Sequence, residues 1–471
     1  MFTQYDQESA VLTSMLRDQF SAYLAGEWDA EKLAVYQTGK LRDVVAYARA
    51  NSPFYRDRLA GFTDDHIAAL RIDTLSQLPF TTKDDLRQAQ FDILSRPISD
   101  AWVFYETTGT TGPATPCPRT HVDSIYNNTV LTAYYREVLA TYGEHQVIGI
   151  SGPSEMHATG DTFGDVCRNL GYAVAKMWPV SPVVGFDRAL EVMRQLPVTG
   201  MFCTPGMAMR LAQKAIDSGL RPRLDFSLKV LLLTGELASP SLLENIALLW
   251  NAEVRNVLYA SQEASVLAAA TSDGALRTAP LINAYEVVDP DTSEIVRPDA
   301  DGRRCGELVI TNLYLGAKPL LRYRTGDLVR IVEPEPGAAV VASSVEVLGR
   351  VRDRLSINGT VLTGYDLENF LLDGLLGYRD YQITIDHDTQ HRDRIGLLLR
   401  ADPNFDRSVL QRAVRRCRDS LDASLTIRFG DPGAVTSTGA MVSWKAARVV
   451  DLRAERSIEN EAAARIAAAR R

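Results

Sequence analysis

The sequence predicts an α/β protein with a large N-terminal domain of helix-covered sheets, which includes an antiparallel subdomain, and a small α+β C-terminal domain. The chain of 471 residues is too long for one ordinary hydrophobic core. From about residue 101 apolar strand-like runs alternate with helical periodicity, and after residue 347 a shorter strand–helix unit follows. These observations predict domains at residues 1–347 and 348–471.

Residues 5–50 are predicted to be helical. In "LRDVVAYARANSPFYRDRL" apolar residues recur at intervals of three and four until Pro53 interrupts the pattern. Residues 60–100 are mixed, which favours connecting helices and loops. Farther along, strand-like runs are followed by a turn or a helix, as expected for a sheet covered by helices: "HQVIGISGPS", "MFCTPGMAMRLAQKAIDSG" and "LKVLLLTGELASPSLLENIALLW".

Residues 280–347 have a different pattern. Short alternating strands are separated by Asp, Pro and Gly, which predicts a mostly antiparallel sheet or barrel attached to the first part. The remaining stretch of roughly 120 residues has the size of a separate domain. It predicts the order strand, strand, helix, strand in "YQITIDH", "RIGLLLRAD", "RSVLQRAVRRCRDSL" and "LTIRFGD". The Ala-rich end from residue 454 is predicted to be a surface or docking helix.

The composition argues against several classes of function. A net charge of −8 and an isoelectric point of about 5.5 speak against a nucleic-acid-binding surface. The five cysteines are scattered without a C-x-x-C spacing, so neither a zinc site nor a disulfide framework is expected, and a cytoplasmic protein is the simplest interpretation. Neither a signal peptide nor an apolar run long enough to span a bilayer is recognised.

A loop rich in glycine and threonine is the first candidate for chemistry. The stretch "TTGTTGPATPCPRT" begins at Thr107 and follows "AWVFYE", a predicted strand. Backbone N–H groups and hydroxyls in such a loop can hold an anion, and phosphate is the usual one. The Walker pattern is absent, and the loop alone fits an ordinary surface turn equally well.

Further polar residues lie at the ends of predicted strands. Asp327 can accept hydrogen bonds from both hydroxyls of a ribose. Glu263 stands in a polar loop, a suitable place for a magnesium ligand. Gly235 and Glu236 end a buried strand, where ligand sites of α/β sheets collect, and Lys445 precedes an apolar strand. Taken singly, each also fits an ordinary turn, a helix cap or a solvated surface position.

Together these stretches resemble the adenylate-forming superfamily of acyl-CoA synthetases, luciferases and peptide-synthetase adenylation domains, and within it the phenylacetate–CoA ligase branch. The likeness covers nearly the whole chain, including the N-terminal "KLRDVVAYARANSPFYRDRL". Five motifs follow the family's order: "TTGTTGPA" for S-S-G-T-T-G-x-P, "YASQE" for Y-G-x-T-E, "YRTGD" for Y-R-T-G-D, "GRVRDRLSING" for G-R-x-D-D with a glycine loop, and "WKAARVVD" for G-K-x-x-R-V-x-D.

The resemblance implies a two-step reaction and a C-terminal domain that is mobile. A carboxylate attacks the α-phosphorus of ATP, which gives an acyl-adenylate and pyrophosphate, and a nucleophile then displaces AMP. ATP and Mg²⁺ are the implied cofactors, and CoA is a candidate co-substrate. The branch favours aromatic or cyclic acids, and the protein is expected to be a monomer or a homodimer.

The family pattern also implies roles for residues of this chain. The catalytic residues would be Lys445, Glu263 and Arg350, with Lys445 bridging the carboxylate and the α-phosphate and Glu263 binding Mg²⁺. The hinge would be Arg352 and Asp353. The implied ATP- and AMP-binding residues are Thr107, Thr108, Gly109, Thr110, Thr111, Gly112, Gly235, Glu236, Tyr259, Ala260, Ser261, Asp327, Arg350 and Lys445.

The acid is expected to contact His157, Gly235 and Ala260, where His157 fits a loop histidine bonded to backbone nearly as well. Four positions depart from the family pattern: Arg352 replaces the acid at the pivot, Ala260 and Gln262 replace a glycine and a threonine, and Trp444 replaces the glycine before the lysine. These changes lie around the nucleotide loop and the second half-reaction. The acceptor therefore stays open among CoA, an amine such as an amino acid, and the thiol of a separate carrier protein.

Two other classes of function remain as alternatives. A non-catalytic nucleotide-binding homologue is expected to lose the metal ligand or the lysine first, yet Glu263 and Lys445 are both retained. A hydrolase would need a G-x-S-x-G elbow, but "GISGPS" around Ser151 has proline where the second glycine belongs.

Overall fold

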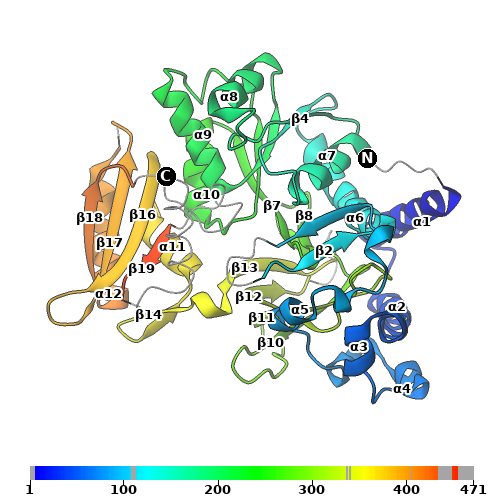
Figure 1. The fold of residues 1–471 in the computed structure, drawn as a ribbon. Coiled ribbons are helices and arrows are strands. Elements are labelled where there is room, and N and C mark those ends of the chain that lie inside the picture. The colour runs from blue at the N-terminus through cyan, green and yellow to red at the C-terminus, as the bar shows by residue number, and fades with distance from the viewer. Residues whose placement is uncertain are drawn as a thin grey trace.

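The computed structural model describes residues 6–107, 113–335, 338, 341–403, 405–432 and 448–453. A mixed sheet of 11 strands forms the body of the molecule, and helices cover it (Figure 1). This is the α/β fold class that the sequence predicts. No helix in these described ranges is long and apolar enough to cross a membrane.

One half of the main sheet is parallel, and its strands alternate with helices along the chain as predicted. The elements are β3 (Val147–Ile150), α7 (Thr159–Asn169), β4 (Ala173–Lys176), α8 (Gly185–Gln195), β5 (Gly200–Cys203), α9 (Pro205–Asp217), β6 (Val230–Thr234), α10 (Pro240–Trp250) and β7 (Glu253–Ser261). Every residue of β5 and β6 is buried, as expected for strands covered on both faces.

The other half of the sheet is antiparallel and consists of β8 (Ser265–Ala270), β9 (Leu276–Thr278), β10 (Asn283–Val288), β11 (Arg303–Asn312), β12 (Tyr323–Val332) and β13 (Ser344–Arg350). The antiparallel pairing predicted after residue 280 is present. However, these strands continue the main sheet, in the order β10-β11-β12-β13-β9-β8-β7-β6-β5-β3-β4. The pairing of Ser344 with Arg277 joins β13 to β9, which covers two strand edges that would otherwise be open.

The N-terminal part is helical, as predicted. Its elements are α1 (Gln7–Leu24), α2 (Ala30–Asn51), α3 (Pro53–Arg58), α4 (Asp64–Ala69), η1 (Ile72–Gln77), α5 (Lys83–Ala89), η2 (Gln90–Ile93), η3 (Ile98–Asp100), β1 (Val103–Glu106), β2 (Pro116–Arg119) and α6 (His121–Ala140). Pro53 starts a new helix, because Ser52 caps α3 and a proline in the first turn sacrifices no helical hydrogen bond. The antiparallel strands β1 and β2 flank the glycine/threonine loop.

The C-terminal part has the predicted order of strand, strand, helix, strand. It contains η4 (Val351–Asp353), β14 (Leu355–Ile357), β15 (Thr360–Leu362), α11 (Gly364–Leu372), β16 (Tyr378–His387), β17 (Asp393–Ala401), η5 (Arg407–Val409), α12 (Leu410–Leu421), β18 (Ser424–Phe429) and β19 (Val449–Asp451). Its four-stranded sheet has the order β18-β17-β16-β19, and lies on the side of the molecule away from the N-terminal helices (Figure 1). The Ala-rich end predicted to be a helix lies outside the described residues.

The C-terminal part is in close contact with α10. The side chain of Asn245 is fully buried, accepts hydrogen bonds from the backbone N–H groups of Gly377 and Tyr378, and donates one to the Tyr378 carbonyl. The buried Glu368 accepts a hydrogen bond of 2.7 Å from the hydroxyl of Ser239, the residue that caps α10. One apolar cluster therefore continues from α10 into α11 and β16.

Candidate active site

Three of the sequence motifs meet where β12 pairs with β13. Asp327 lies within β12 directly opposite Arg350 of β13, and 4.0 Å separate the Asp327 Oδ1 from the Arg350 Nε. Gly326 has a φ of +76°, a left-handed conformation that suits glycine. The hydroxyl of Tyr259, at the end of β7, donates a hydrogen bond of 2.8 Å to the Asp327 Oδ2. This hydrogen bond joins two residues that are 68 positions apart in the chain.

The surroundings of the Asp327 carboxylate allow it to accept further hydrogen bonds. Burial raises the pKa of Asp327 above its ordinary value, and this effect outweighs the lowering by Arg350 and by the Tyr259 hydroxyl. Burial, and then Asp327, raises the pKa of Tyr259, so its hydroxyl stays protonated and donates. Oδ1 has only the distant guanidinium as an ionic partner, and hydroxyl donors such as those of a ribose would stabilise the ionised form.

Glu263 lies in the turn between β7 and β8 and is 9% exposed. Its Oε1 is 3.1 Å from the Nζ of Lys83, the first residue of α5. Burial raises the pKa of Glu263, but Lys83 and Lys318 lower it by more, so the pKa is below its ordinary value. Lys83 was not among the residues that the sequence analysis singled out. Its position could have drawn attention to it, because Lys83 places a positive charge in the first turn of a helix, where negative charges are preferred.

Glu263 fits the requirements of a magnesium ion that arrives with a nucleotide. Within the described part of the chain no group of three His, Cys, Asp or Glu side chains could hold a metal by itself. Mg²⁺ commonly binds through one or two carboxylates, with substrate phosphates and water completing its octahedron. A single ionised glutamate matches the protein's share of that donor set.

The glycine/threonine loop is closed at its base by two hydrogen bonds. The N–H of Thr107 donates to the Thr115 carbonyl at 3.1 Å, and the Thr107 hydroxyl accepts from the Thr115 N–H at 2.9 Å. Several residues assigned from the resemblance lie outside the described residues, namely Thr108, Gly109, Thr110, Thr111, Gly112, Trp444 and Lys445.

Gly235 and Glu236 follow β6, as predicted, and Gly235 has a φ of +83°. The Glu236 Oε2 accepts a hydrogen bond of 2.9 Å from the N–H of Gly206 in the first turn of α9. Ala260 and Ser261 end β7, where the Ser261 hydroxyl accepts from the Ala264 N–H and closes the hairpin. The predicted loop after the strand is therefore a tight turn between antiparallel strands.

His157 is buried in the loop before α7, and its Nδ1 is 2.8 Å from the Thr159 hydroxyl. The same loop is joined to β1, because the N–H of Glu106 donates to the Met156 carbonyl. Next to it the Tyr105 hydroxyl donates to Asp161 at 3.1 Å. The Thr159 N–H also donates to this Nδ1 at 3.3 Å, which is the backbone bond that the interpretation as a loop histidine expects. The imidazole lies in the loop joined to β1, the strand that leads to the glycine/threonine loop.

The predicted hinge residues lie in η4 and are largely exposed. The Arg352 Nε is 3.6 Å from the Asp353 Oδ1. The next residue, Arg354, makes two hydrogen bonds of 3.1 and 2.9 Å to the carboxylate of Asp291. This bidentate pair ties the segment after β13 to the antiparallel half of the main sheet.

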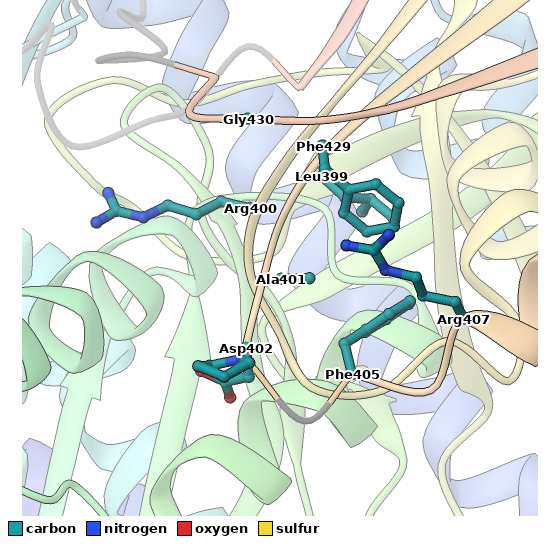
Figure 2. Close-up of a pocket in the computed structure, with 9 residues that line it drawn as sticks. Leu399, Arg400, Ala401, Asp402, Phe405, Arg407, Phe429 and Gly430 are labelled. Atoms are coloured by element: carbon teal, nitrogen blue, oxygen red, sulfur yellow. The ribbon is translucent and has the colours of Figure 1, made fainter.

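A cavity of about 320 Å³ opens at the carboxyl ends of β17 and β18 (Figure 2). Phe405 and Phe429 meet edge to face at 6.1 Å, and the guanidinium of Arg407 stacks 4.2 Å from the Phe429 ring. Arg400 points out of the cavity toward Asp217 at the end of α9, with which it forms an ion pair of 3.3 Å. The cavity therefore combines aromatic walls with one exposed cation.

Comparisons with known proteins agree on one group of enzymes. The chain is 26% identical to "Phenylacetate-coenzyme A ligase" of Thermus thermophilus over 90% of this chain and 97% of that protein. It is 26% identical to the ligase of the same name from Pseudomonas putida over 73% and 76%. No protein-family model matches the chain.

Among solved structures, a 2-hydroxyisobutyryl-CoA ligase in the postadenylation state with 2-HIB-AMP superposes with a TM-score of 0.75, at 21% identity and 93% coverage of both chains. The same ligase in its thioesterification state, with CoA, gives 0.61. A GH3.15 acyl acid amido synthetase gives 0.58 at 16% identity, covering 92% of this chain and 91% of that one. The two states of one ligase differ in score, so the overall arrangement of this chain resembles the postadenylation state more.

Proposed function

We propose that this chain, a relative of the phenylacetate–CoA ligases with the fold of adenylate-forming enzymes, is an ATP-dependent carboxylic acid ligase that works in the cytoplasm as a monomer or a homodimer. The observation that carries the proposal is the convergence of Tyr259, Asp327 and Arg350 from three separate motifs. Glu263 supplies an ionised carboxylate in the same region.

In the first step a carboxylate oxygen of the acid attacks the α-phosphorus of ATP. The bond from that phosphorus to the bridging oxygen of the β-phosphate breaks, and pyrophosphate leaves with the electron pair. Asp327 holds the ribose hydroxyls, with Arg350 beside it, and Gly235, Glu236, Tyr259, Ala260 and Ser261 line the nucleotide. Mg²⁺, when bound through Glu263, neutralises phosphate charge, and the loop from Thr107 to Gly112 and Lys445 stabilise the charge that develops.

The acid is proposed to be aromatic or cyclic and to contact His157, Gly235 and Ala260. For the second step, CoA is the acceptor that the cavity of Figure 2 favours over an amino acid or a carrier thiol. Aromatic walls suit stacking of a nucleobase, and the exposed Arg407 suits a phosphate. A free amino acid has neither of these groups.

The two steps need different domain arrangements. We infer that residues 1–347 and 348–471 move as separate domains about Arg352 and Asp353. A rotation would break the bonds of Asn245 and Glu368 across α10, together with the Arg400–Asp217 pair. The rotation would also separate the apolar cluster that α10 shares with α11 and β16, so these elements would have to part for the gating motion.

Pyrophosphate release tests the proposal. The protein is incubated with Mg-ATP and a pool of aromatic and cyclic acids, with no acceptor, with CoA or with mixed amino acids, and products are identified by mass. Release that depends on an acid is expected, with acyl-CoA as the final product. Lys445→Ala and Asp327→Ala should each reduce the rate by roughly 100-fold or more. If adenylation proceeds at the wild-type rate in both variants, the assigned residues are wrong.

A further inference from the structure

A small cavity lies beside Glu263, and two cations line it. Arg119 of β2 and Lys318 of the β11–β12 connection are each 7% exposed. The free space is about 10 Å³, enough for one atom of the size of a water oxygen. Both side chains belong to segments that the five sequence motifs do not cover.

The guanidinium of Arg119 has no anionic partner within the described ranges of the chain. Its guanidinium lies 5.2 Å from the centre of the Tyr105 ring, and it makes no hydrogen bond or ion pair with any residue that the structure describes. Arg119 follows the glycine/threonine loop directly, because β2 is the strand that leaves this loop and pairs Arg119 with Val103 of β1. Buried arginines are rarely left unpaired.

Lys318 has only neutral partners. Its Nζ donates to the Pro116 carbonyl at 3.1 Å and approaches the Cys117 Sγ at 3.0 Å. Burial raises the pKa of the Cys117 thiol, although Lys318 opposes this, so the thiol does not neutralise the ammonium. Within the described residues Lys318 forms no ion pair, and one of its three N–H groups remains for another acceptor.

The acidic side chains at the cavity are already engaged. Asp123 accepts three hydrogen bonds on its Oδ2, from the N–H and hydroxyl of Thr120 and from the N–H of Ala317. Glu263 is paired with Lys83. With Glu263 paired to Lys83, Asp123 is the carboxylate of the cavity lining left to balance both Arg119 and Lys318, so one positive charge is in excess, and an anion would compensate it.

We infer that Arg119 and Lys318 bind an oxygen of the pyrophosphate group of ATP and stabilise it as the leaving group. The inference rests on the proposed function. The space admits one oxygen, and the side chains of Arg119, Lys318 and Glu263 line it. When the α-phosphorus bond to the bridging oxygen breaks, the electron pair and its charge go to pyrophosphate, and both cations stabilise that charge.

Binding of Mg-pyrophosphate tests this directly, by calorimetry on the full chain. Arg119→Gln and Lys318→Met should each weaken binding roughly tenfold or more, because each removes a charge-assisted hydrogen bond. Two variants serve as matched controls. Arg255 also stacks over a tyrosine, Tyr142, but has Glu253 as a partner, and Lys229 also donates to a backbone carbonyl. Arg255→Gln and Lys229→Met should bind as the wild type does.

Thermal unfolding separates this role from a structural one. Without ligand, Arg119→Gln and Lys318→Met should melt at or above the wild-type temperature, because an uncompensated buried charge is removed. Their stabilisation by Mg-pyrophosphate should be largely lost. In turnover, KM for ATP should rise and kcat fall while KM for the acid stays unchanged, and Arg119→Lys should restore part of the loss.

The inference is overturned if both variants bind Mg-pyrophosphate like the wild type, or if they lose stability without ligand and keep the wild-type KM for ATP. The proposed function can fail separately. If the wild type binds Mg-pyrophosphate through these residues but releases none from ATP with any acid, the anion site stands and the ligase does not.

Discussion

Two buried arginines in this molecule lie over aromatic rings but differ in their partners. Arg322, 5% exposed, stacks 3.9 Å from the Phe80 ring and forms a bidentate ion pair with Glu286, both hydrogen bonds being 2.9 Å. Its remaining donor serves two backbone carbonyls of the segment before α5. Arg119 lies over Tyr105, and its guanidinium has no such partner among the residues that the structure describes.

The difference separates structure from function. Arg322 has a counter-ion and makes four hydrogen bonds, so this arginine holds the N-terminal segment against β10 and the start of β12. Around Arg119 the capacity is unused, and a ligand is the natural anion. A buried charge that has a counter-ion in the chain is part of the fold. A buried charge without a counter-ion among the described residues is a candidate for binding a charged ligand.

The largest effect on stability is expected from breaking the buried ion pair between Arg322 and Glu286. Arg322→Gln should lower the free energy of unfolding by about 3–5 kcal/mol, because it leaves Glu286 buried without its counter-ion. Urea unfolding followed by fluorescence measures the change. A loss below about 1 kcal/mol would falsify the view that this pair is structural.

A neutral buried side chain with several partners is Asn245, which makes three hydrogen bonds. Asn245→Ala leaves the N–H groups of Gly377 and Tyr378 and the carbonyl of Tyr378 without partners, so stability should fall by about 1–3 kcal/mol. Thermal unfolding and proteolysis of the C-terminal part check this. Ser241 lies on α10 with Asn245, and its hydroxyl donates to the side chain of Asn369 on α11. Ser241→Ala removes this single hydrogen bond and should cost less stability. Equal effects of the two changes would contradict the ranking.

Asp327 allows a further test of the comparison between structural and functional charges. It has one close hydrogen-bond donor, Tyr259, and a more distant cation, Arg350, and a functional role is proposed for it. Its raised pKa means that protonation stabilises the fold, a contribution present at low pH and lost as the pH rises through that raised value. Asp327→Asn should therefore be as stable as the wild type at pH 7, or more so by up to about 1 kcal/mol.

This stability difference should vanish below about pH 4, where the carboxyl is protonated in both states. Unfolding experiments across the pH range measure it, while AMP binding at pH 7 should weaken roughly tenfold or more. A variant that is less stable than the wild type at pH 7 yet binds AMP normally would show that Asp327 is structural.

The smallest effect is expected where both charges are solvated. Arg303 and Asp301 form an ion pair of 3.2 Å with side chains 52% and 66% exposed. Asp301→Asn should change stability by less than about 0.5 kcal/mol, and high salt should abolish even that. Urea unfolding at low and high salt checks the expectation. A larger change would mean that this exposed ion pair stabilises the fold as a buried pair does, which would contradict the comparison.

Local sequence patterns predicted much of the fold. The apolar runs of β5 and β6, the helical spacing of α2 and the succession of strand, strand, helix and strand along the C-terminal part each follow from periodicity, which reports burial within one segment. The same patterns could not show that β13 pairs with β9. A strand pattern reveals which face is buried, and leaves the identity of its neighbour to the packing of the whole sheet.

For the site, the sequence by itself supplied the chemical groups. Asp327, Glu263, Tyr259 and Arg350 stand in motifs that can be recognised one by one, because each motif is short and its turn chemistry is local. Only the tertiary structure decided that the Tyr259 hydroxyl meets Asp327, that Lys83 meets Glu263 and that Arg119 and Lys318 share a cavity. Contacts between residues far apart in the chain depend on how sheets and loops pack, and electrostatic partners are set by that packing.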